Sequence, residues 1–234
     1  MFRWRLLPTW ALAPALASCA APFSTLDPAG PAAESVATLW WVMLAGATLV
    51  LVAVTALALW SMRKRRREAE VSVRWHLWGG GLALPLTVLA ALLAYAFALE
   101  WRAHDARTGD ADPLRVEAVA RQWTWEFVYP DAPGGPLRIN DRLHIPAGRS
   151  VEVAITSRDV IHSFWVPRLA GKLDAIPGRV NVLRIEADRP GVYGGLCSEF
   201  CGEGHAGMRF TVEAHRQEDF AAVLARLADE GRRR

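Results

Sequence analysis

The sequence predicts a membrane-anchored all-β protein, in which a hairpin of two transmembrane helices precedes a β-sandwich or β-barrel domain. Residues 36–60 and 78–99 are long apolar spans, and the chain from there to residue 215 alternates short apolar stretches with turn residues. Apolar spans of about 20 residues cross the hydrocarbon core of a bilayer, whereas short alternating stretches are typical of strands. The two patterns follow each other along the chain, so we expect two structural regions.

The first 19 residues resemble a secretory signal, because two arginines near the start precede an apolar stretch. Leu16-Ala-Ser-Cys19 then resembles a bacterial lipobox, in which cleavage leaves a lipidated cysteine. An uncleaved anchor or an ordinary signal peptide is the alternative. Cys19 is one of only three cysteines and has no evident partner, which favours lipidation. Residues 20–35 contain several Pro and Gly residues and are expected to form an extracytoplasmic linker.

The two apolar spans predict a transmembrane hairpin over residues 36–101. Val36–Trp60 has no charged residue, and at about 1.5 Å per residue it is long enough to cross a core of about 30 Å. The basic run 63–67 follows directly, which places this loop on the cytoplasmic side. Trp78–Leu99 returns across the membrane, with a kink expected at Pro85. The predicted location is a bacterial inner membrane, with the C-terminal domain on the periplasmic side.

The charges of the chain follow the same topology. The sequence has 27 basic and 24 acidic residues, yet residues 105–215 hold 15 acidic and 13 basic ones. The positive excess therefore lies mainly in the predicted cytoplasmic loop and the C-terminal tail. We interpret the basic run as a topology signal and exclude nucleic acid as a partner.

Residues 113–215 are predicted to form the β domain. The clearest alternation is Trp123, Trp125 and Phe127, separated by polar or small residues. Because successive side chains of a strand point to opposite faces, these aromatic residues are expected to lie on one face. Residues 216–234 contain apolar side chains at helical spacing and then a basic tail, which predicts a C-terminal helix.

The segment Cys197–Met208 carries four soft-metal ligands within twelve residues, namely Cys197, Cys201, His205 and Met208. Thiolate, imidazole and thioether together suit copper. Two thiolates of one loop can bridge two metal ions, each ion then taking one histidine and one weak axial ligand. A disulfide and a zinc site are the alternatives. However, the redox-disulfide motif Cys-x-x-Cys is one residue shorter, and methionine is a poor zinc ligand.

Three segments resemble subunit II of haem-copper cytochrome c oxidases: Asp159–Pro167, which contains His162, then Lys172–Arg179 and Cys197–Met208. The two preceding apolar spans extend this resemblance over most of the chain. The resemblance implies a cupredoxin-like Greek-key β-barrel that holds a binuclear copper centre, CuA.

The resemblance also assigns roles to individual residues. It implies that Glu199 binds copper through its backbone carbonyl, and that its carboxylate binds magnesium or manganese at the interface with subunit I. It places Trp123 at the surface where electrons arrive from cytochrome c. The implied side-chain ligands of copper are His162, Cys197, Cys201, His205 and Met208.

The implied function is that of subunit II of a terminal cytochrome c oxidase. The chain would accept electrons from cytochrome c at CuA and pass them to haem in subunit I, where oxygen is reduced to water. Its partners would be oxidase subunits I and III, cytochrome c and the lipid bilayer. A CuA subunit of a nitric oxide reductase and a membrane-anchored copper-delivery protein remain as alternatives. A quinol oxidase subunit typically lacks the copper ligands that this sequence contains.

Overall fold

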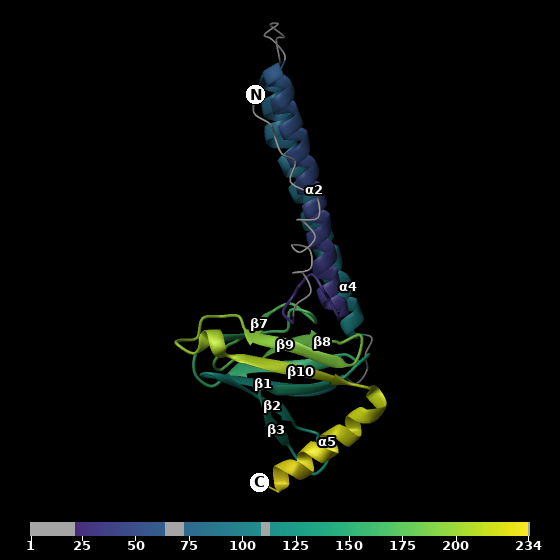
Figure 1. Cartoon of the computed structure of the whole chain (residues 1–234), viewed down its shortest axis with the longest axis vertical. Helices are drawn as coiled ribbons and strands as arrows, with labels where there is room; N and C mark the ends of the chain where they lie inside the picture. Colours follow the sequence, from purple (N-terminus) through teal and green to yellow (C-terminus); the bar gives the residue numbers. More distant parts are fainter. Residues whose placement is uncertain (1–21, 64–72, 109–112, 234) are drawn as a thin grey trace, which may run out of the picture. The chain divides into compact units, whose positions relative to one another are not determined.

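The computed structural model describes residues 22–63, 73–108 and 113–233, and the chain divides into two compact units (Figure 1). One unit is Thr38–Asp110, and the other combines the residues up to Ala37 with those from Ala111 onward. The predicted signal sequence, with Cys19, lies outside the described residues. Of the basic run 63–67, only Arg63 is described.

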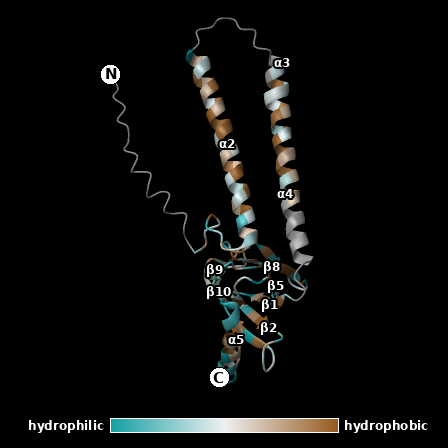
Figure 2. Cartoon of the chain, turned by 90° about the vertical axis from the view of Figure 1, so that its right-hand side faces the viewer, coloured by the Kyte–Doolittle hydropathy of each residue, from teal (hydrophilic) through white to brown (hydrophobic). Residues whose placement is uncertain are grey.

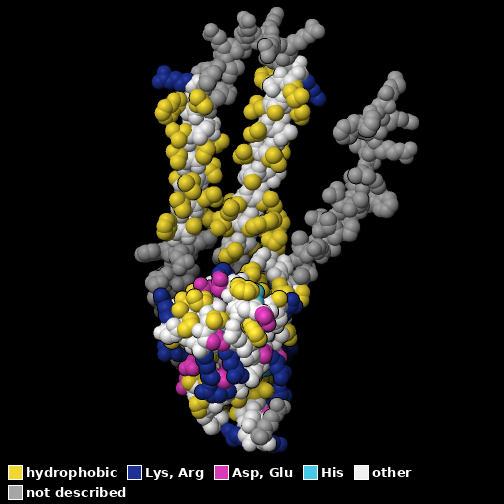
Figure 3. Space-filling view, turned by 90° about the vertical axis from the view of Figure 1, so that its left-hand side faces the viewer, with side chains coloured by type: hydrophobic (Ala, Val, Ile, Leu, Met, Phe, Trp, Pro, Cys, Tyr) yellow, Lys and Arg dark blue, Asp and Glu magenta, His cyan; other side chains and the backbone are white. Residues whose placement is uncertain are grey.

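Both predicted apolar helices are present. They are α2 (Pro31–Arg63) and α4 (Leu84–Thr108), the latter preceded by α3 (Val73–Trp75) and η3 (His76–Ala83). Hydrophobic residues recur along the described parts of both helices (Figure 2), and many hydrophobic side chains lie on the helix surfaces in the space-filling view (Figure 3). Pro31–Arg63 and Leu77–Ala98 are long and apolar enough to cross a membrane, and none of their most apolar stretch is buried within the described chain.

The second apolar span is irregular next to Pro85. Residues His76–Ala83 form a π-helix, in which the Leu84 backbone N–H bonds to the carbonyl of Gly79. Proline has no N–H to donate, and its ring opposes the carbonyl one turn earlier in a regular helix. The helix therefore departs from regular α geometry directly before Pro85, where the sequence predicted a kink.

The β domain consists of two five-stranded sheets. The first sheet has the order β3-β2-β1-β5-β8 and the second the order β4-β10-β9-β6-β7. The strands of the first sheet are β1 (Leu114–Arg121), β2 (Thr124–Tyr129), β3 (Leu137–Asn140), β5 (Val151–Ser157) and β8 (Asn181–Ile185). Those of the second are β4 (Arg142–Pro146), β6 (His162–Trp165), β7 (Leu173–Ala175), β9 (Gly191–Cys197) and β10 (Arg209–His215).

Crossovers between the sheets give the domain its cupredoxin-like topology, as predicted. β1 pairs parallel with β5, and β10 pairs parallel with β4, while the other pairs are antiparallel. The chain passes from one sheet to the other at Asp141, whose φ is 56°. The Asp141 carboxylate accepts hydrogen bonds from the Trp125 N–H and the Thr124 hydroxyl. This corner fixes the start of β4 beside β2.

The core lies between the sheets and is rich in aromatic rings. Trp125 and Phe127 of β2 are fully buried and contact Phe164 of β6 and Phe210 of β10, which stack with centroids 4.8 Å apart. A Cβ at Gly195 would lie 2.2 Å from the Phe210 ring, so this position in β9 requires glycine. These rings support β6, β9 and β10, the three strands that adjoin the Cys197–Met208 loop.

Two further segments cover the domain. The predicted C-terminal helix is α5 (Gln217–Arg232), which buries Leu224 and Ala228. Residues 22–30, within the predicted linker, are held on the domain through Arg168, whose guanidinium lies 2.8 Å from Asp27. The Ala29 N–H donates to the Arg168 carbonyl as well.

Candidate metal centre

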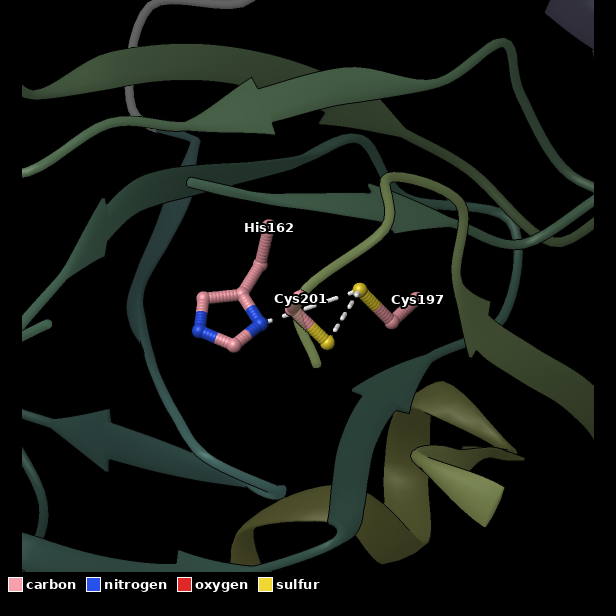
Figure 4. A group of neighbouring side chains, drawn as sticks. All are labelled: His162, Cys197 and Cys201. Carbon is pink, nitrogen blue, oxygen red and sulfur yellow. Dashed lines mark hydrogen bonds between the residues drawn. The ribbon is translucent and has the colours of Figure 1, made fainter. Parts of the chain in front are cut away.

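The predicted metal ligands come together at one end of the second sheet. His162 begins β6, Cys197 ends β9 and Met208 immediately precedes β10, while Cys201 and His205 lie in the loop between the last two strands. The side chains of His162, Cys197 and Cys201 point toward one another (Figure 4). Antiparallel pairing of β6 with β9, in the register Phe164 to Cys197, brings the distant histidine to the loop.

Each thiol has its own histidine. The Cys197 Sγ lies 3.7 Å from the His162 Nδ1, and the Cys201 Sγ lies 3.6 Å from the His205 Nδ1. The two sulfur atoms are 3.9 Å apart, and both cysteines are free thiols. Ligands bound to one metal at about 2.0–2.3 Å in a tetrahedral arrangement lie roughly 3.3–3.8 Å apart. Each cysteine–histidine pair is therefore spaced like two ligands of one ion, and two such pairs suit two ions that share the sulfurs.

The remaining two donors each lie beside a different sulfur of the cysteine pair. The Glu199 backbone carbonyl lies 3.3 Å from the Cys197 Sγ, whereas the Met208 Sδ lies 3.8 Å from the Cys201 Sγ. The structure thus brings together all six residues that the sequence analysis assigned to the site. A weak oxygen ligand on one side and a weak thioether on the other match an axial ligand for each of two ions.

The donor set is largely shielded from water. His162, Cys197, Cys201 and Met208 are buried, His205 is half-buried, and the Glu199 side chain is exposed. Burial, together with the neighbouring Cys197 thiol, raises the pKa of Cys201 to about 12. Two adjacent thiols in a buried site cannot both ionise without a compensating positive charge. A bound cation would supply that charge, so ionisation of this pair is coupled to metal binding.

Asp159 orients the distal histidine. Its Oδ1 lies 2.8 Å from the His162 Nε2, which leaves the Nδ1 free to face Cys197. Partial burial acts to raise the pKa of Asp159, but hydrogen bonds from the Gln122 N–H, His162 and the Val160 N–H bring it below its usual value. An ionised carboxylate on the outer nitrogen fixes the tautomer that a metal needs. The sequence analysis did not identify this role of Asp159, although the residue lies only three positions before His162.

The sequence pattern predicted Trp123 within a strand, but the structure places it in a turn. Gln122 and Trp123 form the turn between β1 and β2, where Arg121 pairs with Thr124, so the alternation begins only after Trp123. As a result Trp123 is 43% exposed while Trp125 is fully buried. The prediction that both tryptophans share one face is wrong, because a tight hairpin turn interrupts the strand period between them.

Gln122 and Trp123 nevertheless contact the metal loop. The Gln122 Nε2 donates to the Cys201 carbonyl at 2.8 Å, and the Trp123 Nε1 donates to the same carbonyl at 3.3 Å. A Cβ at Gly204 would lie 2.4 Å from the indole ring, so the loop needs glycine there for the ring to pack. The sequence analysis did not identify Gln122, since a glutamine in a turn carries no metal-site signal of its own.

The β domain matches one protein family and several known proteins. Residues 114–215, which contain every donor described above, match the family described as the periplasmic domain of cytochrome c oxidase subunit II. Cytochrome c oxidase subunit 2 of Alkalihalophilus pseudofirmus is 30% identical over 221 residues, which cover 88% of this chain and 63% of the relative. The subunit 2 of Thermostichus vulcanus is 44% identical over 112 residues, or 48% of this chain and 33% of the relative.

A solved structure is also similar. The crystal structure of the periplasmic domain of cytochrome oxidase subunit II from Bradyrhizobium japonicum is 30% identical, with a TM-score of 0.47. The match covers 50% of this chain and 94% of that one. The chain spans less than two thirds of the two sequence relatives described above.

Proposed function

We propose that this chain is the electron-accepting subunit of a terminal cytochrome c oxidase, because residues 114–215 match the cytochrome c oxidase subunit II family and the two sequence relatives described above are subunits of that kind. In this role it accepts electrons from cytochrome c and passes them to haem in subunit I, where oxygen is reduced to water. The observation that carries the proposal is the pair of free thiols, each with its own histidine nitrogen at 3.6–3.7 Å.

The residues of this site would hold a binuclear copper centre. The two cysteines would bridge the ions, with His162 and His205 as the imidazole ligands and the Glu199 carbonyl and Met208 as the weak ones. When bound, two bridged coppers share one electron, so that accepting it changes bond lengths little. The chain's own residues exclude water from this site and hold the donors on strands that the aromatic core makes rigid.

Trp123 is the proposed point where electrons enter. Its indole is exposed at the surface, and its N–H is bonded to the carbonyl of Cys201, a copper ligand. The exposed side chains of Val160, Ile161 and Phe200 add an apolar surface from the loops that precede β6 and follow β9. An exposed aromatic ring, with further exposed apolar side chains on these loops, suits the edge of a haem in a docked cytochrome c.

The carboxylate of Glu199 is proposed to bind magnesium or manganese at the interface with subunit I. Its backbone carbonyl faces Cys197, while its side chain is exposed. Among the described contacts, the carboxylate makes none with the proposed copper donors. One residue can therefore serve both metals, because carboxylate oxygens suit hard cations. Manganese EPR of the assembled oxidase tests this role. The Glu199→Gln variant should lose the manganese signal and keep its copper.

Membrane anchoring is proposed through α2 and α4, with the β domain on the periplasmic side of a bacterial inner membrane and Cys19 lipidated. Oxidase subunits I and III complete the proposed complex. Mass spectrometry of the mature N-terminus tests the lipidation, and an intact Met1 would contradict it.

Copper content tests the central proposal. We expect the purified full chain to bind two coppers and to turn purple when oxidised, with absorption bands from copper–thiolate bonds. A chain that binds only zinc, or lacks those bands, would overturn the assignment. A copper-delivery protein would instead release its copper readily to a competing chelator, and the burial of four of the six donor residues favours retention. A nitric oxide reductase would be distinguished by the large subunit that co-purifies.

A further inference from the structure

A second group of metal-ligating side chains lies at the opposite end of β10 from Met208. The parallel pairing of β10 with β4 places Glu213 directly beside His144, and His215 follows two residues later on the same face. The His144 Nδ1 lies 2.9 Å from the His215 Nε2 and 3.5 Å from the Glu213 Oε2. One ligand atom from each of the three residues lies within 4.8 Å of the others.

We propose that His144, Glu213 and His215 form a binding site for a single Zn²⁺ ion, distinct from the copper centre. Two imidazoles and one carboxylate, with water as the fourth ligand, are a donor set that zinc accepts. This site contains no thiol or thioether, so its chemistry differs from that of the copper loop. The fourth position is open to water because Glu213 and His215 are only half-buried.

The spacing of the three donors fits one ion. Nitrogen and oxygen ligands held at about 2.0–2.1 Å in a tetrahedral arrangement lie roughly 3.3 Å apart. The distances of 2.9 and 3.5 Å bracket this value. Binding requires the two ring nitrogens to separate by a few tenths of an ångström and replaces the hydrogen bond between them with bonds to the ion.

The surroundings preorganise the site. The Tyr129 hydroxyl donates to the His144 carbonyl at 2.8 Å and accepts from the His144 N–H at 2.6 Å. The two imidazole planes are inclined by 17° with centroids 5.2 Å apart, so the His144 Nδ1 and the His215 Nε2 face each other edge to edge. Ala147 fixes the other ligand strand, because its N–H donates to the His215 carbonyl at 2.7 Å. The ligands therefore lie on paired strands, which position side chains more rigidly than a loop does.

Two features limit the affinity. An Arg142 nitrogen lies 4.0 Å from the Glu213 Oε1, and the Arg226 charge of α5 also acts on His144. In addition, the His144 Nε2 is buried without a hydrogen-bond partner in the described chain. Metal binding at Nδ1 places the ring proton on Nε2, which has no hydrogen-bond acceptor in the described chain. We therefore expect a labile zinc site that is weaker than one with a complete outer shell.

The site is separate from the copper centre. His215 lies seven residues beyond Met208, and a strand rises about 3.3 Å per residue, so the two sites are roughly 20 Å apart. β10 leads from this end directly into α5 (Figure 1). The zinc proposal therefore stands on its own residues and does not depend on the copper assignment.

Zinc titration of the full chain in detergent tests the proposal. The Cys197→Ser, Cys201→Ser double variant serves as the background, because it removes the competing thiolates. We expect one Zn²⁺ per chain, measured by competition with a chromophoric chelator. His215→Gln and Glu213→Gln should each weaken binding at least tenfold, and Arg226→Gln should strengthen it. The matched control is Glu218→Gln, which neutralises an exposed acid at the start of α5 and should leave the affinity unchanged.

The test avoids replacing the buried His144, whose loss can disturb folding. Near-ultraviolet circular dichroism of each variant checks that the β domain remains folded. Zinc bound by the background chain and equally by the His215→Gln variant would overturn the proposal. The absence of zinc binding to the folded background chain would overturn it as well.

Discussion

The two ends of strand β10 each bring together two histidines, but in different chemical surroundings. At its start, Met208 adjoins a loop that supplies two buried thiols and His205. At its end, His215 meets His144 beside a single carboxylate. The same sheet therefore presents a soft, closed donor set at one end and a harder, partly open set at the other. Sheet pairing creates both sites, whereas the identity of the donors decides which metal each one suits.

The outer hydrogen bonds of the histidines differ even more. The His162 Nε2 is bonded to Asp159 at 2.8 Å, whereas the buried His144 Nε2 has no partner in the described part of the chain. An orienting carboxylate fixes the tautomer and raises the basicity of a ligand. The comparison teaches that a group of ligand atoms locates a site, while the contacts behind those atoms determine how tightly it holds an ion.

The largest expected effect is the loss of one thiol. Cys201→Ser removes the sulfur that contacts Cys197, His205 and Met208, at 3.6–3.9 Å. We expect the copper–thiolate absorption of the binuclear site to disappear and the copper content to fall below two per chain. Zinc binding at the far end of β10 should be unchanged. A purple, two-copper Cys201→Ser chain would contradict the bridging role.

The second-largest effect is expected on the rate of electron transfer from cytochrome c, without loss of the proposed copper. Trp123→Gln should lower the rate of cytochrome c oxidation by the assembled oxidase at least tenfold, because it removes the exposed ring bonded to the Cys201 carbonyl. The copper spectrum should stay nearly intact. Stopped-flow reduction by cytochrome c measures this. The control is Phe200→Ala, which removes an exposed ring that has no described bond to that carbonyl and should affect docking more than transfer. An unchanged rate in the tryptophan variant would remove Trp123 from the route.

This tryptophan also marks where sequence reasoning stops. The alternation is regular in β5 and β10, because each of these strands has one buried face. The proposed copper ligands could be predicted because four of them occupy the single segment Cys197–Met208. The period of two fails at Trp123, since the hairpin turn begins one residue earlier, at Gln122. Nothing in the local pattern distinguishes an exposed turn tryptophan from Trp125.

The His144 group could not be predicted either. His144 and Glu213 are far apart in sequence and become neighbours only through the parallel pairing of β4 with β10. Parallel pairing needs a long crossover, so no short motif encodes it. Likewise, residues 22–30 read as a linker from their composition, and only the contacts of Asp27 and Ala29 with Arg168 show that they are fixed.

A smaller effect tests the outer hydrogen bond directly. Asp159→Asn should weaken copper binding about 10- to 100-fold, because an amide replaces the carboxylate that orients His162. Copper should still bind, with a shifted spectrum, as measured by chelator competition. The control Asp174→Asn changes a surface carboxylate 3.6 Å from Lys172 and should leave the affinity unchanged. Equal affinity in the Asp159 variant would show that the contact is incidental.

The smallest effect should come from Tyr129→Phe, which probes the support of the far site. The Tyr129 hydroxyl makes two buried hydrogen bonds to the backbone of His144, and burial raises the pKa of Tyr129 above its usual value. The tyrosine therefore stays neutral at physiological pH and keeps its proton for the His144 carbonyl. Phenylalanine fills nearly the same space but leaves a buried N–H and a buried carbonyl without this partner. We expect the free energy of unfolding of the β domain to fall by about 1–2 kcal/mol.

The matched control for this change is Tyr193→Phe, which removes one hydrogen bond to the Arg189 carbonyl and should cost less. Denaturant titration followed by near-ultraviolet circular dichroism measures both variants. Because β4 would be less well fixed, zinc binding at His144 should weaken in Tyr129→Phe, whereas the copper spectrum should not change. A copper site that weakened in parallel with the zinc site would mean that the two ends of β10 are coupled. Independence is expected because Asp159 and the loop glycines fix the copper ligands locally, without help from β4.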